Sequence, residues 1–327
     1  FESPFRRICC SGSSFVKILV TGGAGFIGSH LTQRLQVSGH EVCVLDNLAS
    51  GHSQNIPEGV DFISADIADA EVYHSLSGRF NQVIHLASRV GQDASFDDPA
   101  EDIRVNCEAT ALLLEWSKRT RVERFIFASS MNVYGNGNPT DVPLSEAARI
   151  EPISPYAVGK FASEQLLNIY GISDFPTVSL RLFNVYGPGQ DLLNMRQGMV
   201  SIFLKYICDG KPIHIRGSLD RTRDFIFVDD VVTAFTSVMR SEAVGTYNVG
   251  TGIATSVWDL IRTALQILDY DPDSYPLVHE DPTKNDQVGL SSDSRKLQRL
   301  GWEPEVSLQD GLSRTLDAIH GDVASRN

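Results

Sequence analysis

Short apolar runs alternate with amphipathic stretches through the first part of the chain. The runs VKILVTG, from Val16, and EVCVLDN, ending at Asn47, flank FIGSHLTQRLQVSG, in which apolar residues recur at helical spacing. Further apolar runs follow at residues 60–67, 82–88 and 124–130. A helix is predicted over residues 101–118. Apolar runs without polar alternation are typical of a parallel sheet that helices cover on both faces.

The later part of the chain is less regular. A strand is predicted in TVSLRLFNVYG, from Thr177, and from Gly189 onward Pro, Gly and charged residues interrupt the pattern. Helices are predicted over residues 199–208 and 256–268, while DFIFVDDVVTAF and TYNVG are expected to return to the main sheet. The sequence therefore predicts an α/β fold, a Rossmann-type doubly wound parallel sheet with a smaller C-terminal lobe.

A glycine-rich turn joins the first predicted strand to the first predicted helix. VTGGAGFIGSHL satisfies both GxxGxxG and GxGxxG spacing with Gly22, Gly23, Gly25 and Gly28. Glycine lets the backbone approach a pyrophosphate, whose charge the free N–H groups of a helix beginning near Phe26 bind. Asp46 ends the next strand, where a carboxylate binds ribose hydroxyls and repels a 2′-phosphate, so NAD is predicted rather than NADP. The alternatives are a turn without a ligand and, for Asp46, a turn-forming role that is compatible with ribose binding.

Tyr156 and Lys160 lie four positions apart in SPYAVGKFASEQLL, a stretch with helical periodicity. On a helix they share a face and can reach one reacting group. Tyrosine has a pKa of about 10, but a nearby lysine cation and a positive nicotinamide ring both favour the phenolate. The pair is thus a candidate acid/base for a sugar or alcohol hydroxyl. The alternative is two side chains on a solvated helix surface.

Composition narrows the function classes. With 28 basic and 41 acidic residues the net charge is −13, which argues against a general binder of nucleic acid or of anionic membranes. The five cysteines lack metal-type spacing and favour a reduced, cytoplasmic setting, and no metal site is expected. No apolar stretch reaches the roughly 18 residues of a membrane span. Residues 1–14 lack the apolar core of a signal peptide and are expected to lie outside the fold as a leader.

Eight motifs occur in one order along the chain: TGGAGFIGSHL, LDNLASG, DI, HLAS, SSMNVYG, YAVGK, RLFNVYGPG and RDFIFVDDVV. In this series, which covers residues 16–319, the chain resembles an extended short-chain dehydrogenase/reductase of the nucleotide-sugar epimerase/dehydratase family. The resemblance implies NAD, a nucleotide-diphosphate sugar as substrate, and a homodimer paired through helices near residues 101–118 and 155–170. It implies an NAD-binding Rossmann domain at 15–188, to which 224–250 return, and a nucleotide-sugar-binding lobe at 189–223 and 251–327.

The resemblance also implies a role for each matching residue. Ser130 and Tyr156 would hold the substrate hydroxyl, Tyr156 as the acid/base, while Lys160 would bind the nicotinamide ribose and lower the pKa of Tyr156. The implied cofactor contacts are Gly22, Gly25, Phe26, Ile27, Gly28, Asp46, Asn47, Ser50, Gly51, Asp66, Ile67, Leu86, Ala87, Ser88, Asn106, Tyr156, Lys160 and Phe183. The implied substrate contacts are Ser130, Asn184, Arg223 and Asp286.

The residues after Ser130 favour one reaction within the family. Dehydratases and decarboxylases of the family carry a carboxylate there, whereas this chain has Met131 and Asn132, and neither transfers protons. An epimerase needs only the Tyr: it takes the hydroxyl proton while hydride moves to NAD⁺, the 4-keto sugar turns over, and hydride returns to its other face. The resemblance thus favours C4 epimerisation of a UDP-sugar, with tightly bound NAD regenerated in each cycle.

Some positions depart from the family pattern. Thr283 stands where the family has an arginine on the diphosphate, with Lys284 as a candidate substitute, and Ser201 replaces the usual proline of the VIPxF helix. For Arg223, the alternative to a phosphate contact is a surface ion pair with Asp220 or Asp224.

Two other functions compete with the epimerase. An NDP-sugar dehydratase or reductase of the same family would release water or consume NADH. A non-catalytic NAD-binding scaffold or sensor is the alternative of another class, and the joint retention of Ser130, Tyr156 and Lys160 speaks against it.

Overall fold

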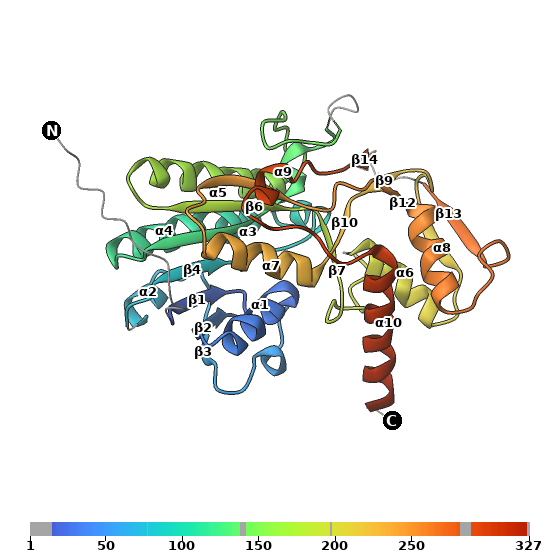
Figure 1. The fold of residues 1–327 in the computed structure, drawn as a ribbon, viewed down its shortest axis with the longest axis horizontal. Coiled ribbons are helices and arrows are strands. Elements are labelled where there is room, and N and C mark those ends of the chain that lie inside the picture. The colour runs from blue at the N-terminus through green and yellow to red at the C-terminus, as the bar shows by residue number, and fades with distance from the viewer. Residues whose placement is uncertain (1–14, 77, 138–141, 197, 282–288, 326–327) are drawn as a thin grey trace.

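A seven-stranded parallel sheet forms the larger part of the molecule (Figure 1). The computed structural model describes residues 15–76, 78–137, 142–196, 198–281 and 289–325. The strands lie in the order β11-β6-β5-β4-β1-β2-β3 and pair in parallel throughout. They are β1 (Lys17–Thr21), β2 (Glu41–Asp46), β3 (Asp61–Ser64), β4 (Gln82–His85), β5 (Arg124–Ser130), β6 (Thr177–Leu182) and β11 (Gly245–Val249). The order reverses between β1 and β4, which confirms the doubly wound α/β fold.

Helices cover both faces of this sheet. They are α1 (Phe26–Val37), α2 (Val72–Ser75), α4 (Ala109–Arg119), α5 (Pro155–Ile172) and α7 (Val228–Met239). Leu31 of α1 and Val231 of α7 join the core on one face, whereas Leu113 of α4 and Leu167 of α5 join the core on the other. Burial on both faces is why the strands read as unbroken apolar runs, and β5 is buried along its whole length.

The smaller lobe lies to one side of the main sheet and has its own core (Figure 1). Its helices are α6 (Met199–Cys208), α8 (Val257–Ile267) and α10 (Leu308–Ser325). Its short strands are β8 (Ile213–Arg216), β9 (Thr222–Arg223), β12 (Thr255–Ser256), β13 (Leu277–Glu280) and β14 (Gly289–Leu290), which form two small sheets. Each pairing is only two to four residues long, so this lobe carries little strand periodicity in its sequence.

Two local expectations are wrong. Strand β10 (Phe225–Phe227) pairs with β7 (Asn184–Tyr186) in a separate ribbon, because the chain leaves the main sheet at Phe183, between β6 and β7. Only β11 and α7 of the returning segments join the main sheet. Conversely, α9 (Arg295–Gln298) was expected in the smaller lobe, but it packs against β11, and Trp302 lies in the main-sheet core.

The helix expected over residues 101–118 is interrupted. It consists of α3 (Pro99–Ile103), a π-helical turn η3 (Arg104–Glu108) and α4. Such turns occur frequently at functional sites because they widen the helix locally and redirect a few side chains. The 3-10 turns of the described residues are η1 (Ser53–Asn55), η2 (Ala94–Phe96) and η4 (Met131–Tyr134). Across the described ranges, no helix combines the length and the apolar character that crossing a membrane requires.

Candidate active site

The glycine turn is a tight crossing of backbone segments. Gly22 has φ +74°, and a Cβ placed there would lie 2.5 Å from the backbone nitrogen of Ala87. A Cβ on Gly28 would lie 2.0 Å from the carbonyl oxygen of Gly22. Helix α1 begins at Phe26 with no side chain capping its N-terminus and no acidic residue in its first turn. Its first N–H groups and the positive end of its dipole are therefore suited to an anion.

Asp46 connects this turn to the loop after β2. One carboxylate oxygen accepts a hydrogen bond from Ala24 N at 3.0 Å, and the other accepts one from Leu48 N at 2.8 Å. The turn-forming interpretation of Asp46 is thus correct, and it leaves the ribose-binding role a prediction. The loop holds the predicted contacts Asn47, Ser50 and Gly51. A Cβ on Gly51 would lie 2.7 Å from the carbonyl carbon of Ala24, so this loop lies directly on the glycine turn.

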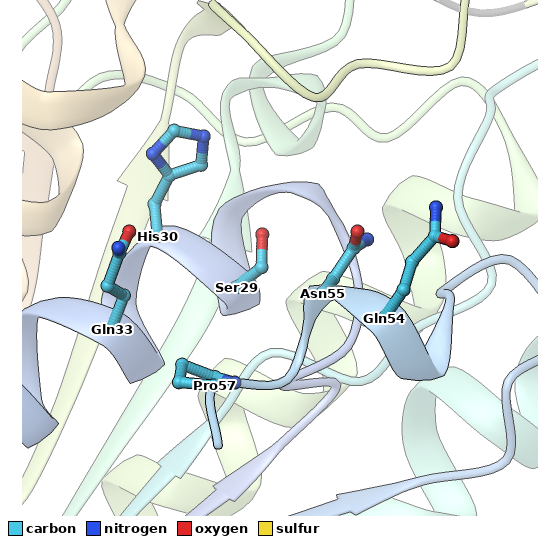
Figure 2. Close-up of a pocket in the computed structure, with 6 residues that line it drawn as sticks. All are labelled: Ser29, His30, Gln33, Gln54, Asn55 and Pro57. Carbon is cyan, nitrogen blue, oxygen red and sulfur yellow. The ribbon is translucent and has the colours of Figure 1, made fainter. Parts of the chain in front are cut away.

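A pocket on the outer side of the glycine turn lies between α1 and η1 (Figure 2). Its lining consists of Ser29, His30, Gln33, Gln54, Asn55 and Pro57. None of these residues was predicted to bind cofactor or substrate. Asn55 donates a hydrogen bond from Nδ2 to the carbonyl oxygen of Ala24 at 3.0 Å, so η1 is bonded directly to the glycine turn.

The loop that follows β4, with Leu86, Ala87 and Ser88, is held by the side chain of Asn106. Asn106 Oδ1 accepts hydrogen bonds from Ser88 Oγ at 2.7 Å and Arg89 N at 3.0 Å, and its Nδ2 donates to Arg89 O at 3.0 Å. Asn106 lies in the π-helical turn, which brings its amide to the loop. The structure therefore brings these predicted cofactor contacts together.

His85 lies behind the same loop and has local partners. Its ring nitrogens bond Thr21 Oγ1 at 2.7 Å and Thr110 Oγ1 at 3.0 Å, and burial lowers the pKa of His85 to about 3. The imidazole is consequently neutral, and both of its ring nitrogens are engaged in these local hydrogen bonds. Asp66, an implied cofactor contact like the buried Ile67, is ion-paired with Arg104 at 3.0 Å.

Ser130, Tyr156 and Lys160 converge between β5 and α5. Helix α5 begins at Pro155 because Ser154 caps it, accepting a hydrogen bond from Ala157 N at 3.2 Å. Tyr156 is 9% and Lys160 is 3% exposed, so the solvated-surface alternative is wrong. Tyr156 shares a hydrogen bond with Ser130. Lys160 Nζ donates to the carbonyl oxygen of Ala128 at 2.9 Å and lies 4.8 Å from the centre of the Phe127 ring.

Burial acts on both titratable groups of this cluster. It raises the pKa of Tyr156 to about 12, against the lowering effect of the Ser130 hydrogen bond. It lowers the pKa of Lys160 to about 7, although the negative charges of Asp102 and Glu164 favour the ammonium. Without a ligand, the tyrosine is therefore a protonated phenol and the lysine is poised to titrate near neutral pH. A cation placed beside Tyr156 shifts it toward phenolate, the form that accepts a proton.

The predicted substrate contacts follow β6. Asn184 Nδ2 donates to the carbonyl oxygen of Asp224 at 3.0 Å and to Met131 Sδ at 3.4 Å. Met131 and Phe183, the last predicted cofactor contact, are buried in the same small cluster. Arg223 is also buried, which contradicts the surface ion-pair alternative, and the carboxylate of Asp224 bonds Thr251, Gly252 and Ser292 instead. Asp286, Thr283 and Lys284 lie outside the described residues.

Two buried acids near the cluster were missed from the sequence. Asp102, at 1% exposure, accepts a hydrogen bond from Asn106 Nδ2 at 2.9 Å. Glu164 forms a bidentate ion pair with Arg181, at 2.9 and 2.7 Å. A signal was present for Glu164, because it falls on the buried face of α5 and Arg181 interrupts an apolar strand. No set of three or more potential metal-ligating side chains gathers among the described residues.

Comparison with known proteins gives a consistent set of relatives. The model of the NAD dependent epimerase/dehydratase family matches residues 18–250. A UDP-glucose 4-epimerase of Mycolicibacterium smegmatis is 37% identical, and the match covers 92% of this chain and 98% of that protein. The structure of a UDP-glucose 4-epimerase with UDP-glucose, from Thermotoga maritima, has a TM-score of 0.90 at 36% identity. The match covers 94% of this chain and 99% of that chain. The structure of a dTDP-glucose 4,6-dehydratase from Streptomyces venezuelae, with NAD bound, has a TM-score of 0.86 at 28% identity. That match covers 94% of this chain and 98% of the other.

Proposed function

The chain belongs to the NAD-dependent epimerase/dehydratase family, and from this premise we propose that it epimerises a UDP-sugar at C4 through a transient 4-keto intermediate. The observation that carries the proposal is the buried cluster of Ser130, Tyr156 and Lys160 with Met131 beside it. Epimerisation needs one acid/base group, and the cluster supplies it. A dehydratase needs a further acid, and the thioether of Met131 accepts a hydrogen bond from Asn184 at that place.

Each residue of the cluster has a separate task. Ser130 Oγ holds the O4 hydroxyl of the sugar by a hydrogen bond. Tyr156, as phenolate, takes the O4 proton during oxidation and returns it when the ketone is reduced. Lys160 stabilises the phenolate by its charge and binds the ribose of the cofactor. The proton that Tyr156 takes during oxidation is the one that it returns during reduction, so a complete cycle needs no net proton exchange with solvent.

The residues around the glycine turn fit NAD. The uncapped start of α1 and the glycine positions without room for a side chain suit a pyrophosphate, and Asp46 lies at the end of β2. When bound, NAD supplies the hydride acceptor. The proposed contacts are the predicted set in the glycine turn, the loops after β2 and β4, Asp66, Ile67, Asn106 and Phe183. The carboxylate of Asp46 selects NAD by accepting ribose hydroxyl hydrogen bonds.

The two lobes are proposed to bind different ligands, with the bounds expected from the sequence. Residues 15–188 with 224–250 bind NAD, while 189–223 and 251–327 bind the nucleotide sugar, except that α9 and Trp302 pack with the main sheet. Asn184 and the buried Arg223 bind the diphosphate, and Asp286, which lies outside the described residues, is a further proposed substrate contact. A buried arginine suits this task because its planar fork binds phosphate oxygens in pairs.

The proposal also covers the oligomeric state of the protein and its location in the cell. We assign a homodimer paired through α4 and α5, since Val158, Ile169 and Ile172 of α5 expose apolar side chains. We assign the cytoplasm because Cys43, Cys107 and Cys208 are all free thiols.

The decisive experiment incubates the purified protein separately with UDP-glucose, UDP-N-acetylglucosamine, UDP-glucuronate and their GDP, CDP and dTDP counterparts. Proton NMR with mass spectrometry is expected to show a new sugar of unchanged mass with a UDP-sugar. Tyr156→Phe is expected to lower the rate by about 10²–10⁴-fold and to leave the bound NAD content unchanged. Tyr270→Phe, which removes an exposed hydroxyl in the smaller lobe, is the matched control and retains the wild-type rate.

Other outcomes of this experiment contradict the proposal. A product lighter by one water identifies a dehydratase and places an acid elsewhere in the site. NADH consumption identifies a reductase. Absence of any product, with Tyr156→Phe indistinguishable from wild type, identifies a non-catalytic NAD-binding protein.

A further inference from the structure

Asp102 is a buried acid to which the proposed reaction gives no task. It lies in α3, and its Oδ1 accepts a hydrogen bond from Asn106 Nδ2 at 2.9 Å. Among the described residues it forms no ion pair within 4 Å, so its charge has no direct salt-bridge partner there. A buried carboxylate without a paired cation is unfavourable unless some other charge uses its field.

The packing of α3 and η3 against α5 brings Asp102 toward the Tyr156–Lys160 pair. Gly159 lies between those two residues, and a Cβ there would lie 3.0 Å from Asn106 Cβ. Ser163, one turn further along α5, donates a hydrogen bond from Oγ to the carbonyl oxygen of Asn106 at 2.7 Å. The glycine and the serine thus hold the two segments in close contact at the level of the pair. The negative charge of Asp102 favours the ammonium of Lys160 and, taken alone, the protonated phenol of Tyr156.

We propose that Asp102 is a positioning residue for this reaction: its buried carboxylate supplies the negative charge that keeps Lys160 protonated, and its bond to Asn106 fixes the loop after β4. The inference rests on the proposed function, because a cationic Lys160 is what stabilises the Tyr156 phenolate. With Lys160 neutral, Tyr156 loses the charge that makes it a base at neutral pH.

Other charged or titratable groups also act on this pair and on Asp102. They come from β4, the loop after it and α5, and are His85, Arg89 and Glu164. His85 is neutral because burial lowers its pKa to about 3. Glu164 is neutralised by Arg181 at 2.7 Å. Burial raises the pKa of Asp102, whereas the charges of Arg89 and Lys160 favour its carboxylate. Arg89 is itself paired with Asp98, so of the two acids that act on Lys160, Asp102 is the one without an ion pair within 4 Å among the described residues.

Asp102→Asn separates charge from hydrogen bonding. An asparagine oxygen still accepts the bond from Asn106 Nδ2, whereas the negative charge is lost. The pKa of Lys160 is then expected to fall, and the alkaline limb of the kcat–pH profile to move toward lower pH by about one unit. Just above the wild-type limb, kcat falls about tenfold with little change in KM. Glu108→Gln, which removes an exposed carboxylate from the same π-helical turn, is the matched control and leaves the profile unchanged.

A double-mutant cycle tests the same coupling without relying on turnover. The denaturation midpoints at pH 7 of wild type, D102N, K160M and the double variant are compared, with the protein as purified. D102N is expected to lower the midpoint when Lys160 is present and to lower it much less in the K160M background. If D102N alone fails to fold, recovery of folding in D102N/K160M would also show that the effect of D102N depends on Lys160.

The outcomes separate this inference from the proposed function. An unchanged kcat–pH profile for D102N, or additive midpoint shifts in the cycle, overturns the role of Asp102 and leaves epimerisation standing. No epimerisation by wild type, together with non-additive midpoints, overturns the proposed function and retains the coupling of Asp102 to Lys160.

Discussion

Helix α5 carries two buried charges whose surroundings differ. Glu164 meets Arg181 in a bidentate pair at 2.9 and 2.7 Å, and Ser129 Oγ also donates to it. Among the described residues, Lys160, one turn earlier, bonds a single carbonyl oxygen, that of Ala128, and its Nζ lies over the Phe127 ring. Burial opposes the charge of both cations, but Glu164 outweighs it and raises the pKa of Arg181, whereas the pKa of Lys160 falls to about 7.

The difference shows how one helix serves structure and chemistry together. A paired guanidinium keeps its proton at every working pH and fixes how α5 lies on β6. A lysine with a carbonyl as its only hydrogen-bond partner in the described structure is left close to its titration point. The same contrast predicts opposite effects on stability when each cation is replaced.

The largest effect is expected for Arg181→Met. The replacement leaves Glu164 buried without its cation, so the free energy of unfolding falls by about 3–5 kcal/mol. Chemical denaturation monitored by circular dichroism measures it. Arg181→Met/Glu164→Gln removes both charges and is expected to recover part of the loss. A loss below about 1 kcal/mol for the single variant would show that this pair is no more important than a surface ion pair.

Lys160→Met is expected to act in the opposite direction. The pKa of Lys160 falls from 10.5 to about 7 on folding, so between those pH values the unfolded chain binds more protons and stability rises with pH. The burial penalty is complete below about pH 7 and absent above about pH 10.5. Methionine removes this penalty but also removes the charge that is favourable for Asp102, so cofactor-free K160M is expected to exceed wild type by only about 1–2 kcal/mol in stability at pH 7.

The pH dependence provides the control for this second prediction. The advantage of K160M over wild type is expected to shrink between pH 7 and pH 10, as wild-type Lys160 gives up its proton. Denaturant titrations at pH 7, 8.5 and 10 measure the difference. A constant difference across that range contradicts a depressed pKa at Lys160.

The main sheet was predictable because most of its strands, unlike the exposed edge strand β3, are buried on both faces and leave a strong apolar signal. The glycine turn, Asp46 and the Tyr156–Lys160 pair were equally visible, since each depends on residues close in sequence. The ribbon of β7 with β10 was not, because a strand of three residues has no measurable period and its partner is far along the chain. The same limit applies to the packing of α9 on β11.

Asp102 was invisible for a different physical reason. Helical spacing places Asp102 with Ala109 and Leu113, seven and eleven residues later, and both are buried. The residue type argues against burial, because an aspartate is rarely buried unless it has a partner, and the amide of Asn106 is apparent as that partner only in the fold. The acid is therefore found from burial and hydrogen bonds in the folded protein, whereas Tyr156 is found from spacing alone.

The smallest effect is expected for Ser163→Ala, which weakens the contact between α5 and η3 without changing any charge. Loss of the bond from Ser163 Oγ to Asn106 O lowers the free energy of unfolding by about 1 kcal/mol, measured by chemical denaturation. Ser117→Ala is the control, because Ser117 bonds Leu113 O within α4 and joins no two elements. The kcat–pH profile of S163A is expected to keep its alkaline limb, since Asp102 and Lys160 retain their charges. A shift like that of D102N would mean that packing, rather than the charge of Asp102, sets the protonation of Lys160.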